Sequence, residues 1–307
     1  MSSSENFKAQ SANRPLAGVF WMFMTGVMFV CVTVIVKTVG DSLPAAQAAF
    51  MRYVLGLVFL IPMIKPIRDA QLSRRAVKLF VIRGVVHSGG VMLWFFAMTR
   101  ISIAEVTAMN YLAPVYVTIG AALFLGEKLA SRRIAAIAFA IVGAGIILRP
   151  GFRELSSGHF AMLFTAILFA GSYLVAKIMS GEVKPVVVVG MLSITVTIGL
   201  APMAYFVWVP PTLEQVGWMF LLACFATLGH YTMTLAFAAA PVTVTQPVTF
   251  LQLVWAVLVG AIFFGEGIDG WVILGGVFIL SSVLFITWRE HVLKKQARIS
   301  ATSSAKI

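Results

Sequence analysis

Long apolar runs separated by short polar connections fill almost the whole chain. Each run is close to the roughly 20 residues that an α-helix needs to cross about 30 Å of hydrocarbon. A strand of a membrane barrel is about half as long and alternates apolar with polar positions, which these runs do not. The pattern therefore predicts an all-α integral membrane protein with ten transmembrane helices. The predicted spans are residues 17–38, 44–64, 79–99, 104–125, 132–149, 158–179, 184–208, 215–238, 243–264 and 270–288.

The composition supports this class and excludes a soluble one. Apolar residues make up 60% of the 307 positions and charged residues only 11%, whereas a soluble domain carries about 25% charged residues. A net charge of +12 is also typical of nucleic-acid-binding proteins. Here, however, the basic residues lie mainly between apolar runs, so we expect no nucleic-acid partner. The two cysteines, Cys31 and Cys224, lie inside apolar runs and are expected to be buried and unpaired.

The basic residues also predict the orientation of the spans. If the N-terminus is cytoplasmic, 17 of the 23 Lys and Arg residues fall on the cytoplasmic side, four fall outside and two, Arg52 and Arg83, lie within spans. Cytoplasmic connections of membrane proteins carry such an excess. We therefore expect cytoplasmic tails at 1–15 and 289–307, and a first span that is retained rather than cleaved as a signal peptide.

The two halves of the chain align with each other when one is shifted by about 140 positions. This predicts two five-helix units at 16–150 and 156–288. Because five is an odd number, the second unit must enter the membrane from the opposite side, which makes an inverted repeat and favours transport by alternating access. The shift places Gly18, Phe20, Met22, Thr25, Phe29 and Lys37 on Gly158, Phe160, Met162, Thr165, Phe169 and Lys177.

Several short segments in both halves resemble those of a known transporter family. They are Trp94-Phe95-Phe96-Ala97-Met98, Ala104-Glu105-Val106-Thr107-Ala108, Pro114, Phe124-Leu125-Gly126-Glu127, Leu235-Ala236-Phe237 and Gly265-Glu266. Between residues 16 and 288 the chain resembles the drug/metabolite transporter superfamily, and within it the ten-helix EamA-type transporters. The resemblance implies a secondary transporter in the bacterial inner membrane. It also implies a central cavity lined by the first four helices of each half, with the fifth and tenth helices at the periphery.

Polar residues within spans are costly in lipid and are therefore the candidate binding residues. Arg52 lies about half-way along its span. Arg83, His87, Gly90 and Trp94 follow at helical spacing and share one face of the third span. Comparable faces occur on the fourth, sixth, eighth and ninth spans. The residues expected to bind substrate are Arg52, His87, Trp94, Asn110, Tyr111, Tyr173, His230, Tyr231, Gln252 and Trp255.

A second group of residues is expected to act in gating or structure. Pro114 frees a backbone carbonyl and should kink the fourth span. Arg83 is close to a span end, where it can reach the membrane surface. Lys37 and Lys177 occupy equivalent repeat positions near opposite faces, and Glu127 and Glu266 occupy matching span ends, where each carboxylate is expected to cap or pair locally.

The acidic residues all lie in tails, connections or span ends. Arg52 consequently lacks an evident acidic partner, although Glu105 at a span edge could reach it, and a ligand that bears a carboxylate or phosphate is favoured. The family resemblance suggests amino acids, S-adenosylmethionine-like metabolites, vitamins such as riboflavin, or hydrophobic drugs as cargo. Export of drugs or toxic metabolites and, less favoured, a channel or a membrane-embedded enzyme are the alternatives.

No enzyme signature supports that last alternative. The four histidines are scattered without metal-ligand spacing, and no phosphate-binding glycine-rich loop precedes a lysine. We therefore expect no catalytic residue, no metal and no cofactor. The expected partners are a small-molecule substrate and the lipid bilayer, with the protein a monomer or a weak homodimer.

Overall fold

The computed structural model describes residues 14–40, 42–126, 131–152, 154–179, 183, 185–240 and 242–304. Within these ranges the chain is helical and contains ten helical segments long and apolar enough to cross a membrane. The ten predicted spans are therefore confirmed, with boundaries that mostly shift by only a few residues. The largest shift at a helix start is in the third span, which begins at Arg74 rather than 79, because Ser73 accepts a hydrogen bond from the Ala76 N–H and caps a basic first turn.

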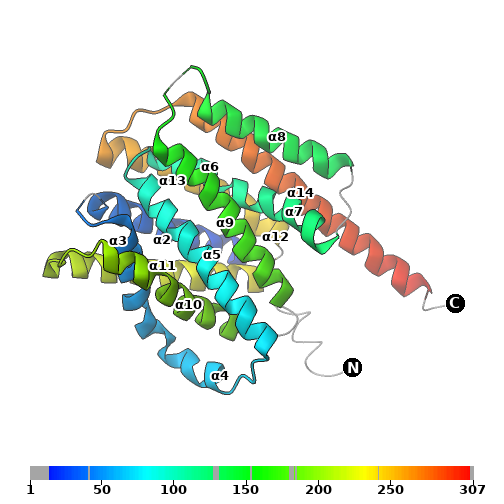
Figure 1. Cartoon of the computed structure of the whole chain (residues 1–307). Coiled ribbons are helices and arrows are strands. Elements are labelled where there is room, and N and C mark those ends of the chain that lie inside the picture. The colour runs from blue at the N-terminus through cyan, green and yellow to red at the C-terminus, as the bar shows by residue number, and fades with distance from the viewer. Residues whose placement is uncertain are drawn as a thin grey trace.

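Seven of the spans are single helices. They are α2 (Pro15–Val39), α5 (Arg74–Met98), α8 (Ser131–Leu148), α9 (Ser157–Met179), α10 (Pro185–Phe206), α11 (Leu213–Ala239) and α14 (Gly270–Ser304). Helix α14 is the longest and extends well beyond the bundle (Figure 1).

The other three spans are interrupted. The second consists of α3 (Ala45–Gly56), a 3₁₀ segment η1 (Leu57–Met63) and α4 (Ile64–Arg68). The fourth divides into α6 (Ile103–Asn110) and α7 (Leu112–Leu125), and the ninth comprises α12 (Val242–Thr245), η2 (Gln246–Thr249) and α13 (Phe250–Phe264). Pro114 accounts for the break at Tyr111, because a proline cannot donate to the carbonyl four residues earlier. Pro62 lies within η1 of the second span, and Pro247 lies within η2 of the ninth.

Helices from the two halves of the chain pack against each other more than within each half. Helix α2 packs most extensively on α11, α5 on α9, and α8 on α14. Small residues allow these approaches: a side chain at Gly18 would overlap Ala240, and one at Gly84 would overlap Thr195. The buried Thr25 and Thr232 hydroxyls are 2.9 Å apart and join α2 to α11. Close packing through small residues is the usual way in which helices associate in lipid.

The fifth and tenth spans lie side by side along one edge of the bundle (Figure 1). Gly143 and Gly275 bring their backbones together, since a Cβ on Gly143 would lie 2.7 Å from the Gly275 carbonyl oxygen. The rings of Phe139 and Phe278 stack with centroids 4.2 Å apart. This arrangement agrees with the peripheral position expected of these two helices.

Candidate functional site

Basic and aromatic side chains from four different spans meet between the two halves of the chain. Arg52 and Tyr53 come from α3, Arg83 and His87 from α5, Phe169 and Tyr173 from α9, and His230 from α11. The charge of Arg52 acts on both His87 and His230, and the charge of Arg83 acts on His87 and Tyr173. We call these seven residues the basic-aromatic cluster. Two of its helices belong to the first half and two to the second.

His87 is the buried centre of this cluster. Its Nδ1 lies 3.1 Å from the hydroxyl of Ser172 on α9, and its ring lies 4.9 Å from that of Phe169. Gly90, one turn further along α5, makes this possible, because a Cβ there would lie 2.7 Å from the Phe169 ring. Phe169 in turn contacts Tyr173, with centroids 6.2 Å apart. A continuous series of rings therefore runs along the contact between α5 and α9.

Arg52 lies over the Tyr53 ring, with 4.4 Å between its Cζ and the ring centroid. An arginine at the centre of a membrane costs about 2.5–3.5 kcal/mol on insertion scales. A cation–π contact of about 0.5–2 kcal/mol offsets only part of that cost. No carboxylate of the described residues pairs with Arg52. The suggestion that Glu105 reaches it is wrong, because Glu105 binds His159 and Ser102 at one end of the bundle.

Arg83 does not reach the membrane surface, which corrects the expectation from its place near a span end. Its side chain is only 7% exposed, and its Nη1 donates a 3.1 Å hydrogen bond to the Val188 carbonyl of α10. Its Nε is buried without a hydrogen-bond partner among the described residues. The guanidinium is thus turned into the protein, and part of its donor capacity is unused.

Other members of the cluster are accessible. Tyr173 is 43% exposed and His230 is also exposed. Both also interact with charged residues on other helices, Tyr173 with Arg83 and His230 with Arg52. His230 also meets the ring of Phe29 on α2, with centroids 5.3 Å apart. The cluster therefore combines two cations, two imidazoles and the rings of aromatic residues.

A second group of candidate residues lies where the two interrupted spans of α6/α7 and α13 meet. The Tyr111 hydroxyl donates a 2.9 Å hydrogen bond to the carbonyl of Thr249, which joins the break in the fourth span to the break in the ninth. Asn110 Oδ1 and Trp255 Nε1 are buried without partners among the described residues. Gln252 lines a small crevice with Thr33 and Thr107. Discontinuous helices of this kind mark the substrate site in many transporters.

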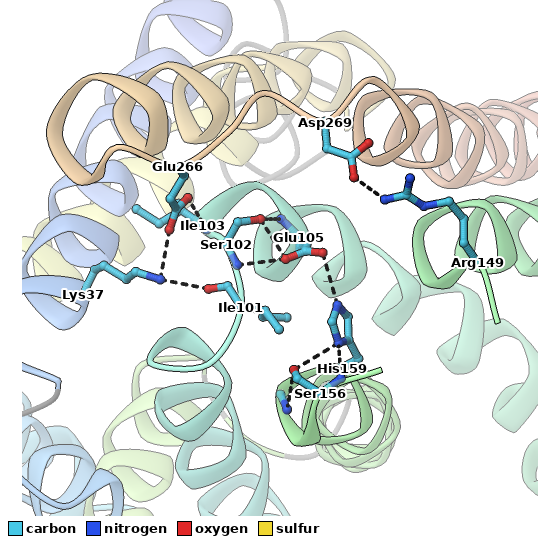
Figure 2. A network of polar contacts seen from close by, with 11 residues as sticks. Lys37, Ile101, Ser102, Ile103, Glu105, Arg149, Ser156, His159, Glu266 and Asp269 are labelled. Carbon is cyan, nitrogen blue, oxygen red and sulfur yellow. Dashed lines mark hydrogen bonds and ion pairs between the residues drawn. The ribbon is translucent and has the colours of Figure 1, made fainter. Parts of the chain in front are cut away.

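One end of the bundle is fastened by a polar network, which Figure 2 shows; we call it the Glu266 end. Lys37 Nζ lies 2.9 Å from Glu266 Oε1 and also donates to the carbonyl of Ile101. Glu266 Oε2 accepts a 2.9 Å hydrogen bond from the N–H of Ile103, the first residue of α6. Glu266 therefore caps a helix and pairs at a span end, as expected, and the helix that it caps belongs to the other half.

Two further contacts strengthen the Glu266 end. Glu105 accepts hydrogen bonds from the Ser102 backbone and hydroxyl, and it lies 3.1 Å from His159 of α9. Arg149 pairs with Asp269 and so joins the ends of α8 and α14 (Figure 2). Apart from the Ser102–Glu105 cap and the local contacts of Ser156, such as that with His159, the contacts drawn in Figure 2 connect segments that are distant in the sequence.

Some predicted site residues are not brought into either group. Trp94 packs edge-on against Phe95 within the apolar core, two turns from His87. Tyr231 is 61% exposed and lies on the side of α11 opposite Gly229, which packs against α2. Glu127 and the side chain of Lys177 lie outside the described residues.

The structure also reveals residues that the sequence reasoning did not select. Tyr53 and Phe169 belong to the cluster, Ser172 contacts its His87, and Gln47 exchanges two hydrogen bonds with the backbone of Val209, at 2.6 and 2.9 Å. Gln47 and Ser172 were detectable as polar residues inside apolar runs. Ser172 has a short side chain and Gln47 lies near the start of its span, so both resembled ordinary helix-packing residues.

Comparisons with known proteins bear on what this arrangement does. A family model described as the EamA-like transporter family matches the chain twice, at residues 16–149 and 156–288. The chain is 31% identical to the riboflavin transporter of Rhizobium johnstonii, over 92% of this chain and 94% of that protein. It is 26% identical to the pseudopaline exporter of Pseudomonas aeruginosa, over 88% and 96%. It is also 24% identical to the S-adenosylmethionine uptake transporter of Rickettsia prowazekii, over 90% and 94%.

The fold has a counterpart among solved structures. One crystal structure, 16% identical in sequence, superposes with a TM-score of 0.58 and covers 90% of this chain and 98% of the other. At that identity the likeness concerns the fold alone.

Proposed function

Because the chain belongs to the EamA-like transporter family, we propose that it is a secondary transporter that works by alternating access in the bacterial inner membrane. Its relatives are transporters of small metabolites rather than enzymes. The finer proposal is that the metabolite binds in the basic-aromatic cluster. One observation supports this: the cluster takes side chains from two helices of each half, so any relative movement of the halves changes it.

The arrangement of the two ends is consistent with such a cycle. The Glu266 end is held together by contacts between the halves, chiefly Lys37 to Glu266 and Glu105 to His159. Because the number of spans is even, the two chain ends lie on the same side of the membrane, which is the side opposite the Glu266 end. We propose that these ends are cytoplasmic, since most of the basic residues fall on that side. The Glu266 network would then close the extracytoplasmic side in this conformation.

We propose the two halves as inverted repeats, because each family match covers five spans. The breaks in the fourth and ninth spans support this, since these spans hold equivalent positions in the two halves and Tyr111 and Thr249 join them. A site at such a pseudo-symmetric junction can be exposed to either side in turn.

Purified protein in liposomes tests the proposal. Vesicles are loaded with an isotope-labelled bacterial metabolite extract, and the compounds that leave or exchange are identified by mass spectrometry. We expect at least one compound to move chemically unchanged, and its flux to fall with Arg52→Ala. Arg100→Ala is the matched control, because Arg100 also lies 4.4 Å from a ring, that of Phe96, but is exposed at the Glu266 end. Chemical conversion of a compound, or no movement of any compound, contradicts transport.

A further inference from the structure

The charges of both arginines of the basic-aromatic cluster act on the imidazole of His87, and neither arginine is neutralised by a described carboxylate. Within the described part of the chain, Arg52 lies over the face of the Tyr53 ring. Arg83 is 7% exposed, gives one hydrogen bond to a backbone carbonyl and leaves Nε buried without a described partner. A guanidinium carries five N–H donors in a planar fork that matches the oxygens of a carboxylate or phosphate. The cluster therefore holds unused donors of the type that bind anions.

The acidic residues of the network at the Glu266 end pair with residues other than these two arginines. Glu105 and Glu266 form the network at one end of the bundle, and Asp269 pairs with Arg149. No aspartate or glutamate of the whole sequence lies in the middle of a span. A cationic ligand would therefore meet two like charges and no counter-charge, whereas an anion would meet two charge-assisted donors.

The surroundings of the arginines are aromatic. His87, Phe169 and Tyr173 form a series of rings with centroids 4.9 and 6.2 Å apart, and Tyr53 lies under Arg52. Aromatic side chains favour offset or edge contacts with a planar ligand. A molecule held by its anionic end at the arginines would place an attached ring against these faces.

We infer that the cluster selects an organic anion, with a phosphate or paired carboxylates bound between Arg52 and Arg83 and a planar ring lying along Phe169 and Tyr173. This inference rests on the proposed function, whose substrate it narrows. The inferred substrate differs in charge from the compounds for which two relatives are named. Riboflavin is uncharged, and S-adenosylmethionine carries a cationic sulfonium.

Matched ligand pairs test the charge selection. Each pair shares one ring and differs in the anionic group: flavin mononucleotide and riboflavin, adenosine monophosphate and adenosine, phthalate and its diamide. Binding is measured by thermal shift and calorimetry on the full chain in nanodiscs. We expect at least one anion to bind about tenfold or more tightly than its neutral partner, the ratio that one charge-assisted hydrogen bond supplies. The best-binding pair also identifies whether phosphate or carboxylate is preferred.

Variants assign that preference to the two arginines. Arg52→Gln and Arg83→Gln should each remove most of the preference for the anion, measured as the ratio of the affinities for the anion and its neutral partner. Arg52→Lys should retain part of this preference and Arg100→Gln all of it. If Arg83→Gln does not fold, because it loses the Val188 contact, Arg83→Lys and the Arg52 variants still carry the test. Added salt should weaken binding of the anions more than that of their neutral partners.

Three results overturn the inference: a neutral or cationic member binds best, no anion binds, or the preference for the anion survives in both Arg→Gln variants. These outcomes are distinguishable from failure of the proposed function. If riboflavin or adenosine crosses proteoliposomes and its anionic partner does not, transport stands and the selection of anions is wrong.

Discussion

Lys37 at the end of the first span and Glu266 at the end of the ninth form an ion pair, with 2.9 Å between Nζ and Oε1. The same carboxylate caps α6 through the Ile103 N–H, so one side chain joins three spans. Both partners are mostly buried, with 19% and 15% of their side chains exposed. A contact of this kind has to separate if the Glu266 end opens during transport.

Substitutions of Glu266 should therefore loosen that end in two distinguishable ways. Glu266→Gln keeps an oxygen acceptor for the Ile103 N–H but loses the charge that attracts Lys37. Glu266→Ala loses both. We expect hydrogen exchange of the first turn of α6 to rise strongly in the alanine variant and less in the glutamine variant. Equal protection in all three proteins would show that Glu266 does not hold this end closed.

Gly90 should be needed for substrate binding although it has no side chain. An alanine there would place its Cβ 2.7 Å from the Phe169 ring and displace that ring from His87. We expect Gly90→Ala to weaken substrate binding about tenfold or more, the size of effect that overpacking of 1–3 kcal/mol produces at a binding surface. Gly26→Ala in α2 is the control, since no atom lies within 4 Å of a Cβ at that position. If calorimetry shows unchanged substrate affinity in Gly90→Ala, Phe169 does not belong to the binding site.

The peripheral pair of helices permits a test of packing that leaves the cluster untouched. Gly143→Ala forces α8 away from the Gly275 carbonyl and should destabilise the protein by about 1–3 kcal/mol. Gly145→Ala on the same helix meets no atom within 4 Å and should be neutral, or stabilising by up to about 1 kcal/mol. Thermal melting in detergent compares the two. If both melt alike, α8 and α14 do not pack through Gly143.

The proposed orientation predicts the behaviour of reporter fusions. A fluorescent protein attached after Ile307 should be bright and alkaline phosphatase attached there should be inactive, because the even number of spans keeps both termini on the basic, cytoplasmic side. Fusions in the connection that carries Glu154, between α8 and α9, should give the reverse pattern. Active phosphatase at the C-terminus would show that the orientation is the reverse of the proposed one, with the Glu266 network on the cytoplasmic side.

The sequence predicts the spans well because the bilayer leaves few alternatives. Only helices of about 20 apolar residues satisfy the backbone in hydrocarbon, so run length alone locates them. The break at Tyr111 was also predictable, since Pro114 removes a specific hydrogen bond. The 3₁₀ turn from Leu57 to Met63 was not predicted, although Pro62 lies within it, because an apolar run does not distinguish one helical hydrogen-bond pattern from another.

The candidate site was predictable in its residue types and less so in its partners. Arg52, His87 and His230 were identified because polar groups are costly in lipid, and in the structure the charge of Arg52 acts on both histidines. Glu105 was assigned a wrong partner and Glu266 was assigned none, because contacts between distant spans depend on how the halves pack. Arg83 was expected at the surface because its distance from the span end was known, while its contact with Val188 on α10 was not.

The packing of α2 on α11 has a consequence for how the protein is made. Thr25 of the first span hydrogen-bonds with Thr232 of the eighth, and Gly18 fits against Ala240. At 5–20 residues per second, the ribosome takes on the order of ten seconds or more to supply α11 after α2 has left it. The first five spans thus enter the bilayer with their main packing surfaces uncovered. These surfaces gain their partners only when the second half arrives, so a chain that stops after the fifth span keeps them uncovered.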